Sequence, residues 1–441
     1  MDNSKKNRKV SKKSDSEYKK FFLRRTVKFE IAILIVFVLL IGRLAWIQFV
    51  NGSEYKEYAY EQQTMNQIIS PKRGTIYDST GQPLAISADV DTVTINPSEI
   101  EYENGDKVEP EKIAKAFSDI FALDYNEVLE KVNSDSMIET IARKVENDKI
   151  ILLENWLDEN DVTSGVNIDD DTKRYYPHED LASQVIGFCG TDSQGLEGLE
   201  SYWDSVLTGT PGKTVYSKSV INQEIPETES TYIDAENGSD LVLTLDINIQ
   251  EIAEKYLEQA VKENKCTRGG NVIIMDPSTG DILAMATYPN YNLNTPFEPY
   301  TDSLKGSWET LSSEERVTAL QNTWKNRAVS DGYEPGSTFK LVTASIALEE
   351  GLVQTDIPND FTCNIIENVD GVEISCWRTY GAHHGQSLRE ALGNSCNPAF
   401  IQLGRRIGAE TFYKYFNAFG FFDTLNSGLS GEVSRLFSRL R

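Results

Sequence analysis

A run of twelve uncharged residues, 31–42, follows a strongly basic amino terminus and constrains the chain more than any other feature. The apolar stretch continues to residue 50 past a single Arg43, which gives it the length of a helix that crosses a bilayer. Residues 1–28 carry 11 Lys/Arg against three Asp/Glu, and this excess predicts a cytoplasmic amino terminus. The pattern predicts a basic cytoplasmic tail at 1–28, a single transmembrane anchor at 29–50, and a translocated remainder.

A cleavable signal peptide is the alternative interpretation, because the uninterrupted apolar core is short. No small-residue cleavage site of the A-x-A kind follows the run, so an uncleaved anchor is favoured. The 441 residues carry a net charge of −25, of which the tail contributes +8 and the remainder −33. So acidic an exterior does not fit a nucleic-acid binder, and the length predicts two or three domains.

Hydrophobic patterns predict a mixed α+β, multidomain chain. Residues 71–85 are typical of a strand, a glycine-centred turn and a strand, whereas 109–132 predict a helix that breaks near Asp124. The polar, turn-rich segment 226–240 predicts a domain boundary. Beyond it we expect a strand at 241–245 that leads into a helix capped by Asp246, a hairpin at 271–286, and mostly helical structure from about residue 336.

The five cysteines are too few and too scattered for a disulfide scaffold, and no Cys/His grouping has the sequence spacing of a metal site. We therefore expect no metal and no cofactor. Cys363 and Cys376 flank a predicted hairpin at 364–375, and both a disulfide and two free thiols remain open for them. A general-base role is discounted for all three histidines, His178, His383 and His384. The last two lie in the segment 381–385, which predicts a surface turn.

A serine followed three residues later by a lysine is a weak signal, because it also occurs at Ser16 and Ser53. Ser337 stands apart because it precedes a predicted apolar helix at 341–348, so that its hydroxyl and the Lys340 amine share one helical face. A serine hydroxyl becomes a good nucleophile when a base takes its proton, and a desolvated lysine can be that base. The pair is a candidate nucleophile and general base.

A second polar element, Ser395 with Asn397, follows 58 residues after Ser337 and lies between two predicted helices. There a second hydroxyl can relay a proton to a leaving amine, and an amide can hold the substrate and orient the lysine. Serine and asparagine are also ordinary residues between helices. Their occurrence together with the Ser337 and Lys340 pair is what favours catalysis.

With these motifs the chain resembles the class B penicillin-binding proteins, most of all their division and sporulation members. Further matches fall in family order along the chain, at 73–85, 195–209, 244–250, 276–280 and 326–328. The resemblance implies a pedestal domain of the dimerisation type at 51–230 and a partial penicillin-binding/β-lactamase-like transpeptidase domain at 238–441. It also implies structural rather than catalytic roles for four pedestal residues: Arg73, Gly74, Asp78 and Glu197.

The resemblance implies a serine-type D,D-transpeptidase that cross-links peptidoglycan through an acyl-serine intermediate. Ser337 would be acylated by a D-Ala-D-Ala stem peptide or by a β-lactam, Lys340 would be its base, and Ser395 and Asn397 would form the second catalytic element. The implied location is the cell membrane, with one pass and the bulk outside the cytoplasm. Implied partners are the membrane and membrane proteins of cell-wall assembly, and no nucleic acid.

The family's third motif, a Lys-Ser/Thr-Gly strand, is not found between Asn397 and Arg441, so we expect little or no transpeptidase activity of the chain as written. Residues 427–428 lack the preceding lysine and follow a predicted helix at 409–419 too closely. Two alternatives stay open. One is a non-catalytic, membrane-anchored interaction protein of the cell-wall machinery; the other, a membrane-bound β-lactam sensor or β-lactamase, is weakened by the large pedestal region.

Overall fold

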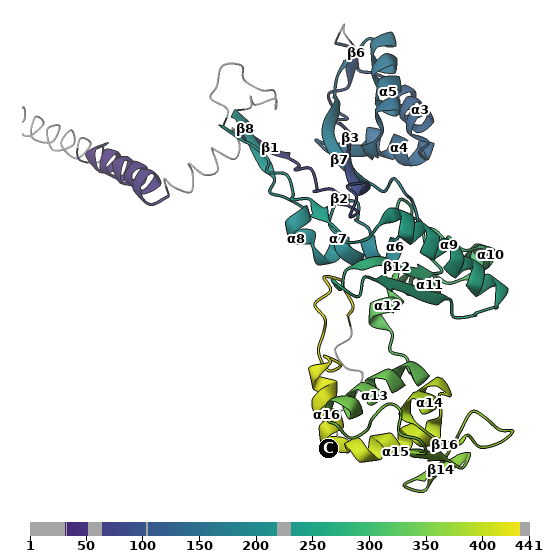
Figure 1. The fold of residues 1–441 in the computed structure, drawn as a ribbon. Coiled ribbons are helices and arrows are strands. Elements are labelled where there is room, and N and C mark those ends of the chain that lie inside the picture. Colours follow the sequence, from purple (N-terminus) through teal and green to yellow (C-terminus); the bar gives the residue numbers. More distant parts are fainter. Residues whose placement is uncertain (1–30, 32, 52–63, 103–104, 218–230, 433–441) are drawn as a thin grey trace, which may run out of the picture. The chain divides into compact units, whose positions relative to one another are not determined.

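A computed structural model of the chain describes residues 31, 33–51, 64–102, 105–217 and 231–432 (Figure 1). They fall into two compact units, one from residues up to 69 together with 211–235, the other from 70–210 together with 236 onward. The predicted tail at 1–28, part of the predicted boundary, and the last nine residues lie outside the described residues.

The first unit contains a helix and a small sheet. Residues 33–49 are helical, as the apolar run predicts. Among the residues that the structure describes, no helix has both the length and the apolar character needed to cross a membrane. Strand β8 lies between β1 and β9 in an antiparallel sheet: β1 (Thr64–Ile69), β8 (Gly212–Ser217) and β9 (Thr231–Ile233).

The second unit begins with a five-stranded sheet whose longest strand, β3 (Pro83–Ile95), pairs with β2, β5 and β7. Three helices cover one side of β3 and β7 (Figure 1), and their apolar faces form a core around Phe117, Leu153 and Ile95. The remaining bounds are β2 (Ile76–Tyr77), β4 (Glu101–Tyr102), β5 (Glu139–Val145), β6 (Val162–Ser164), β7 (Val166–Tyr175), α3 (Pro110–Phe121), α4 (Tyr125–Val132) and α5 (Asn147–Glu159).

Asp124 explains why the predicted helix at 109–132 is two helices. Its carboxylate accepts hydrogen bonds from the main-chain N–H groups of Asn126 and Glu127, which makes it the N-cap of α4. The preceding Ala122 adopts a left-handed conformation that ends α3. The break near Asp124 is therefore confirmed.

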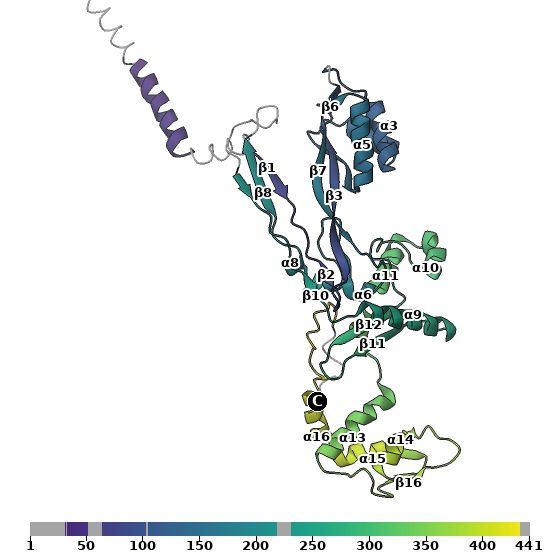
Figure 2. The same cartoon turned by 45° about the horizontal axis from the view of Figure 1, so that its top comes forward.

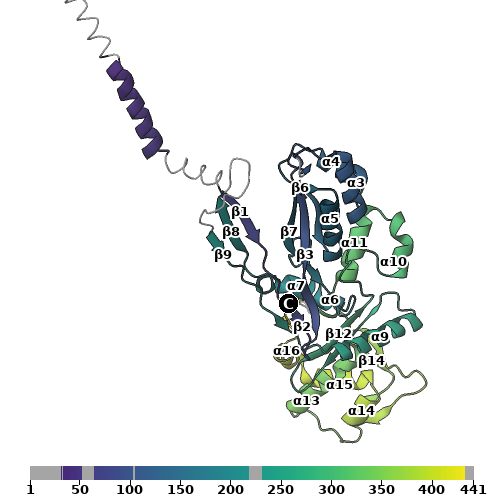
Figure 3. The same ribbon diagram turned by 90° about the horizontal axis from the view of Figure 1, so that it is seen from above.

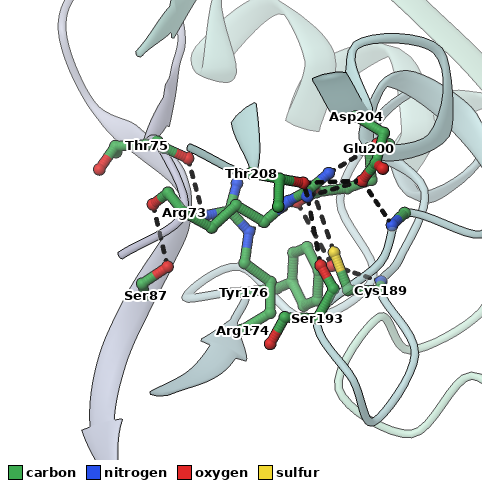
Figure 4. Close-up of polar contacts among 12 residues, drawn as sticks. Arg73, Thr75, Ser87, Arg174, Tyr176, Cys189, Ser193, Glu200, Asp204 and Thr208 are labelled. Carbon is green, nitrogen blue, oxygen red and sulfur yellow. Dashed lines mark hydrogen bonds and ion pairs between the residues drawn. The ribbon is translucent and has the colours of Figure 1, made fainter. Parts of the chain in front are cut away.

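A buried ion network joins the start of this unit to its later helices (Figure 4). The Glu200 carboxylate, fully buried, lies 2.6 Å from the guanidinium of Arg73 and 2.6 Å from that of Arg174. Arg73 also reaches Asp204 at 2.7 Å. Burial alone would lower the pKa of Arg73, but the adjacent Glu200 carboxylate reverses this effect and raises it. Arg73 therefore has a structural contact of the predicted kind, namely a buried ion pair with Glu200.

Gly74 and Asp78 also hold the second unit together. A side chain at Gly74 would collide with the main chain of Ser239, since a Cβ atom there would lie 2.0 Å from its carbonyl oxygen. The buried Asp78 carboxylate accepts a hydrogen bond from the N–H of Ile247, far along the chain, at 3.1 Å. One hydrophobic core then runs from Leu84 and Phe188 to Tyr291, so residues before and after 240 share it.

Helix α9 (Ile247–Glu263) packs on the hairpin of β11 (Gly270–Met275) and β12 (Ile282–Tyr288), as Figure 2 shows. Asp246 caps this helix, and the buried Gln250 side chain hydrogen-bonds to both the N–H and the C=O of Met285. The predicted cap and hairpin are confirmed. The strand predicted at 241–245 is shorter, β10 (Leu241–Val242), because its parallel partner β2 offers only two residues.

The last part of the second unit is mainly helical and gathers α13, α14 and α15 together (Figure 3). Its helices are α13 (Lys340–Glu349), α14 (Leu388–Gly393), α15 (Asn397–Ile407) and α16 (Ala409–Ala418), with a 3-10 turn η2 (Gly336–Phe339). Short strands pair as β13 (Phe361–Cys363) with β16 (His384–Gln386) and β14 (Ile366–Val369) with β15 (Val372–Ser375).

Between α9 and η2 lie β11, β12, α10 (Asp302–Ser307), η1 (Trp308–Thr310), α11 (Ser313–Trp324) and α12 (Arg327–Ser330). The short helices α6 (Ser183–Ile186), α7 (Gly198–Tyr202) and α8 (Asp204–Leu207) precede β8.

The buried network makes a stability prediction. Replacing Glu200 by Gln keeps the shape but removes the buried carboxylate that Arg73 and Arg174 share. Arg73 keeps Asp204 as a partner, whereas Arg174 loses its counter-charge, so the free energy of unfolding should fall by about 3–5 kcal/mol. The matched control is Asp89→Asn, which breaks the exposed ion pair between Lys72 and Asp89 and should change stability by less than about 1 kcal/mol. Urea unfolding of both variants measures the difference. Equal, small effects would show that the Glu200 network does not hold the domain together.

Candidate active site

Ser337 and Lys340 lie at the junction of the 3-10 turn η2 and helix α13. Gly336 begins this turn with a left-handed backbone, φ +61°, a conformation that glycine adopts without steric cost. Two residues after Ser337, the ring of Phe339 packs against the rings of Phe416 and Phe421, at 5.2 and 5.8 Å between centroids. The apolar anchor of Phe339 therefore fixes the turn while the Ser337 side chain stays exposed.

Ser395 and Asn397 lie in the bend between α14 and α15, as predicted. The capping box at the start of α14 and the proline in the first turn of α15 are both present. Ser395 adopts a left-handed backbone conformation, φ +47°, which is uncommon for a residue with a side chain. In this bend both side chains lie against the Lys340 amine.

The four predicted residues form one hydrogen-bonded set. The Lys340 Nζ atom lies 3.3 Å from Ser337 Oγ, 3.1 Å from Ser395 Oγ and 2.7 Å from Asn397 Oδ1. The two hydroxyl oxygens of Ser337 and Ser395 are 2.8 Å apart. The prediction that one helical turn brings the hydroxyl and amine of residues 337 and 340 together agrees with this geometry.

The contacts of the Lys340 amine suit a proton acceptor. Its two shortest contacts are to the Asn397 amide oxygen, at 2.7 Å, and to the Ser395 main-chain carbonyl, at 2.8 Å, and both groups only accept hydrogen bonds. A neutral amine has two N–H donors and one lone pair, so it can satisfy these two oxygens and still turn its lone pair toward a serine hydroxyl. Asn397 and the Ser395 carbonyl thus orient the amine.

Burial of Lys340 also favours the neutral form of its amine. Desolvation of Lys340 lowers its pKa, against the opposing effect of the nearby Cys396 and Cys376 thiols, and the net direction is downward. A lowered pKa increases the fraction of neutral amine that can take a proton from Ser337.

The first N–H groups of a helix also lack intrahelical partners, so those at the start of η2 can face an oxyanion at Ser337. The set can therefore carry out acyl transfer to serine.

Several supporting groups were not predicted from the sequence. The Asn397 amide donates to the main-chain oxygen of Ser375 at 3.0 Å, which links α15 to the end of β15. The Trp377 indole donates to the Asn394 carbonyl at 2.7 Å, just before Ser395. Contacts of this kind depend on how β15 lies against α15, and no local pattern in the sequence reports that.

The structure also brings together four residues that the sequence spacing kept apart. Cys363, Cys376, Cys396 and His383 place their ligand atoms within 4.8 Å of one another, and Cys396 lies in the bend between Ser395 and Asn397. All five cysteines of the chain are free thiols in the structure. The expectation that no Cys/His grouping resembles a metal site considered distances along the chain only. His383 therefore does not belong to a simple surface turn, whereas His384 is exposed.

Comparison with known families gives two matches that together cover most of the chain. The family described as "Penicillin-binding Protein dimerisation domain" matches residues 68–243, and "Penicillin binding protein transpeptidase domain" matches residues 270–437. The transpeptidase match lies inside the predicted region 238–441, whereas the dimerisation match extends 13 residues beyond the predicted pedestal at 51–230.

Comparison with individual proteins agrees. The chain is 32% identical to "Stage V sporulation protein D" of Bacillus subtilis (strain 168), over 90% of this chain and 57% of that protein. It is 28% identical to "Peptidoglycan D,D-transpeptidase FtsI" of Escherichia coli (strain K12), over 92% of this chain and 63% of that protein. The chain thus spans about three fifths of the length of these relatives.

Solved structures share the fold. The penicillin-binding protein PBP2 of Helicobacter pylori, in a structure described as a complex with MreC, superimposes with a TM-score of 0.63 at 21% identity, over 84% of this chain and 68% of that chain. Penicillin Binding Protein 2X of Streptococcus thermophilus gives a TM-score of 0.60 at 22% identity, over 85% and 55%.

The aromatic anchor of the Ser337 turn is testable. Phe339→Ala should lower the free energy of unfolding by about 2–3 kcal/mol, less than for a fully buried phenylalanine, and should speed hydrogen exchange at 336–349. The control is Leu341→Ala on the following helix α13, where the leucine is 58% exposed and truncation should have little effect. Hydrogen exchange read by mass spectrometry compares the two. Unchanged exchange in Phe339→Ala would mean that the turn is held by something else.

Proposed function

Because the chain belongs to the class B penicillin-binding proteins, we propose that the whole protein is a serine-type peptidoglycan D,D-transpeptidase. The observation that carries this proposal is the hydrogen-bonded set of Ser337, Lys340, Ser395 and Asn397, with polar contacts of 2.7–3.3 Å. The proposed substrate is a stem peptide ending in D-Ala-D-Ala, and β-lactams are proposed to acylate the same serine. The 441 residues span about three fifths of the named relatives, so the reaction is proposed for the whole protein.

The first half-reaction follows from the contacts. Ser337 Oγ attacks the carbonyl carbon of the scissile D-Ala-D-Ala bond and gives its proton to the Lys340 amine. A C–O bond forms, and the negative charge moves to the carbonyl oxygen, where N–H groups at the start of η2 stabilise it. The C–N bond then breaks as the departing D-Ala amine receives a proton through the Ser395 hydroxyl, which lies 2.8 Å from Ser337 Oγ and 3.1 Å from Lys340 Nζ.

The second half-reaction reverses these roles. An amine from a neighbouring stem peptide attacks the acyl-serine carbonyl and loses its proton to the Lys340 and Ser395 pair. The ester C–O bond breaks, and the Ser337 oxygen recovers a proton from Lys340. A β-lactam performs only the first step, since its ring amide supplies the acyl group and the opened ring stays attached.

A non-catalytic interaction protein remains the second candidate function. The structural neighbour from Helicobacter pylori is described as a complex with MreC, which supports a proposal that this protein also binds partner proteins of cell-wall assembly. The expectation that the chain as written has little transpeptidase activity also stays a prediction.

We also propose that the apolar run anchors the protein in the cell membrane, with the amino terminus in the cytoplasm and the bulk outside. The proposal is supported by the helical state of 33–49 and by the exposure of its apolar side chains, for example Leu34 at 65% and Leu39 at 67%. The basic residues at 1–28 set the orientation.

Covalent labelling tests the catalytic proposal. The whole protein, expressed from its own gene, should form a stable adduct with a fluorescent penicillin at Ser337, and Ser337→Ala should lower labelling at least about 100-fold because the nucleophile is lost. The control is Ser345→Ala, an exposed serine on the following helix α13, which should label normally. Labelling that survives Ser337→Ala would contradict the assignment. The 441-residue chain, run in parallel, should label weakly; a strong adduct there would overturn the expectation of low activity.

Fusion to bacterial alkaline phosphatase, which is active only outside the cytoplasm, tests the anchor. A fusion after residue 50 should be active and should stay with the membrane pellet in alkaline carbonate, whereas a fusion after residue 28 should be inactive. An active, soluble fusion after residue 50 would instead indicate a cleaved signal peptide.

A further inference from the structure

Three buried thiols and one imidazole lie close together at the bend that carries Ser395 and Asn397. The side chains of Cys363, Cys376 and Cys396 are 0–2% exposed, and the ligand atoms of all three and of His383 lie within 4.8 Å of one another. The Cys376 Sγ atom is 3.6 Å from Nδ1 of His383. Zn–S bonds of about 2.3 Å and Zn–N bonds of about 2.0 Å in a tetrahedron place donor atoms about 3.5–3.8 Å apart. The Cys376 and His383 donors already have this separation, and the other donors, all within 4.8 Å, would move closer by at most about 1 Å on binding zinc.

The fold positions each donor through main-chain hydrogen bonds. Cys363 ends β13 and pairs with His384, which puts the neighbouring His383 at the same end of the small sheet. The Cys376 N–H donates to the Ile365 carbonyl at 2.6 Å, and Cys396 is the N-cap residue of α15. The donors therefore come from three separate elements, and only the folded chain assembles them.

The simplest alternative is that three cysteines pack as small apolar side chains, because free cysteine is often buried. That account leaves the His383 imidazole, a polar group, directed at a thiol in the same cluster. Apolar packing does not explain this contact.

A disulfide is the second alternative. Three sulfurs allow three pairings, and each pairing leaves one buried thiol and the imidazole unused. A tetrahedral metal site uses all four groups at once. Thiolate and imidazole ligands favour Zn²⁺ among common cations, and they disfavour Mg²⁺ and Ca²⁺, which prefer oxygen.

We propose that Cys363, Cys376, His383 and Cys396 form a structural Zn²⁺ site that fixes the start of α15 to the two small sheets. Three thiolates, a neutral imidazole and Zn²⁺ carry a net charge of −1. Arg378 supplies nearby positive charge, since it interacts electrostatically with His383. With four protein ligands, the metal has no open position for substrate and is not a catalytic centre.

The location gives the metal a positioning role. Cys396 lies between Ser395 and Asn397, and Cys376 follows Ser375, whose carbonyl accepts the hydrogen bond from Asn397. Metal bonds to these two cysteines would hold both sides of that hydrogen bond. Any effect on acylation rests on the proposed function, whereas metal binding itself does not.

Metal content tests the site in the unmodified chain. The 441-residue chain, purified in detergent with a reductant and exposed to Zn²⁺, should retain about one zinc after gel filtration. Replacing zinc by Co²⁺ should give strong visible bands of a tetrahedral site together with sulfur-to-metal charge transfer in the near ultraviolet. Removing the metal with a chelator should lower the melting temperature, because binding to the native state is lost.

Matched variants identify the ligands. Cys376→Ser, Cys396→Ser and His383→Asn should each lose most of the bound zinc and the tetrahedral cobalt spectrum. Two controls outside the cluster should keep both, namely Cys266→Ser, at an exposed cysteine, and His384→Asn, at the neighbouring exposed histidine. The proposal is overturned if the unmodified chain retains no zinc, if its cobalt spectrum is octahedral, if the controls lose metal equally, or if peptide mapping without reductant finds a disulfide within the cluster despite added zinc.

Discussion

The amine of Lys340 is the interaction on which the rest of the site depends. Lys340 is the first residue of α13, yet the shortest contacts of its amine are to Asn397 and to the Ser395 carbonyl, at the start of α15. One side chain therefore joins two helices and holds two serine hydroxyls within reach of one lone pair. The surrounding structure supplies what this requires: the Phe339 anchor fixes the turn that carries Ser337, and Ser375 fixes Asn397.

The packing of the second unit connects α9, Tyr291 and Trp324, which precede this site along the chain, to residues more than a hundred positions earlier. Asp78 accepts a hydrogen bond from Ile247 at the start of α9, and Phe188 packs edge-on against Tyr291 and Trp324. The Glu200 network then fixes the segment around Arg73. Residues before and after 240 thus share buried polar and apolar contacts, which explains how a domain without catalytic residues can stabilise the region beyond it.

Local patterns in the sequence predicted the elements whose causes are local. The helix break at Asp124, the cap at Asp246, the hairpin at 271–286 and the meeting of Ser337 with Lys340 each depend on residues a few positions apart. Features that depend on distant partners were missed: the short β10, limited by its two-residue partner β2, and Glu200 as the counter-ion of Arg73. The Cys/His cluster was missed for the same reason, since its spacings of 13, 7 and 13 residues resemble no local metal motif.

A double-mutant cycle tests most directly whether Asn397 acts by orienting Lys340. The second-order rate of penicillin acylation would be measured for the whole protein and for Lys340→Ala, Asn397→Ala and the double variant. If Asn397 works through the lysine, each single variant slows acylation strongly, and Asn397→Ala has almost no further effect once the amine is absent. Multiplicative losses in the double variant would contradict the account, because they would show that the amide and the amine act independently.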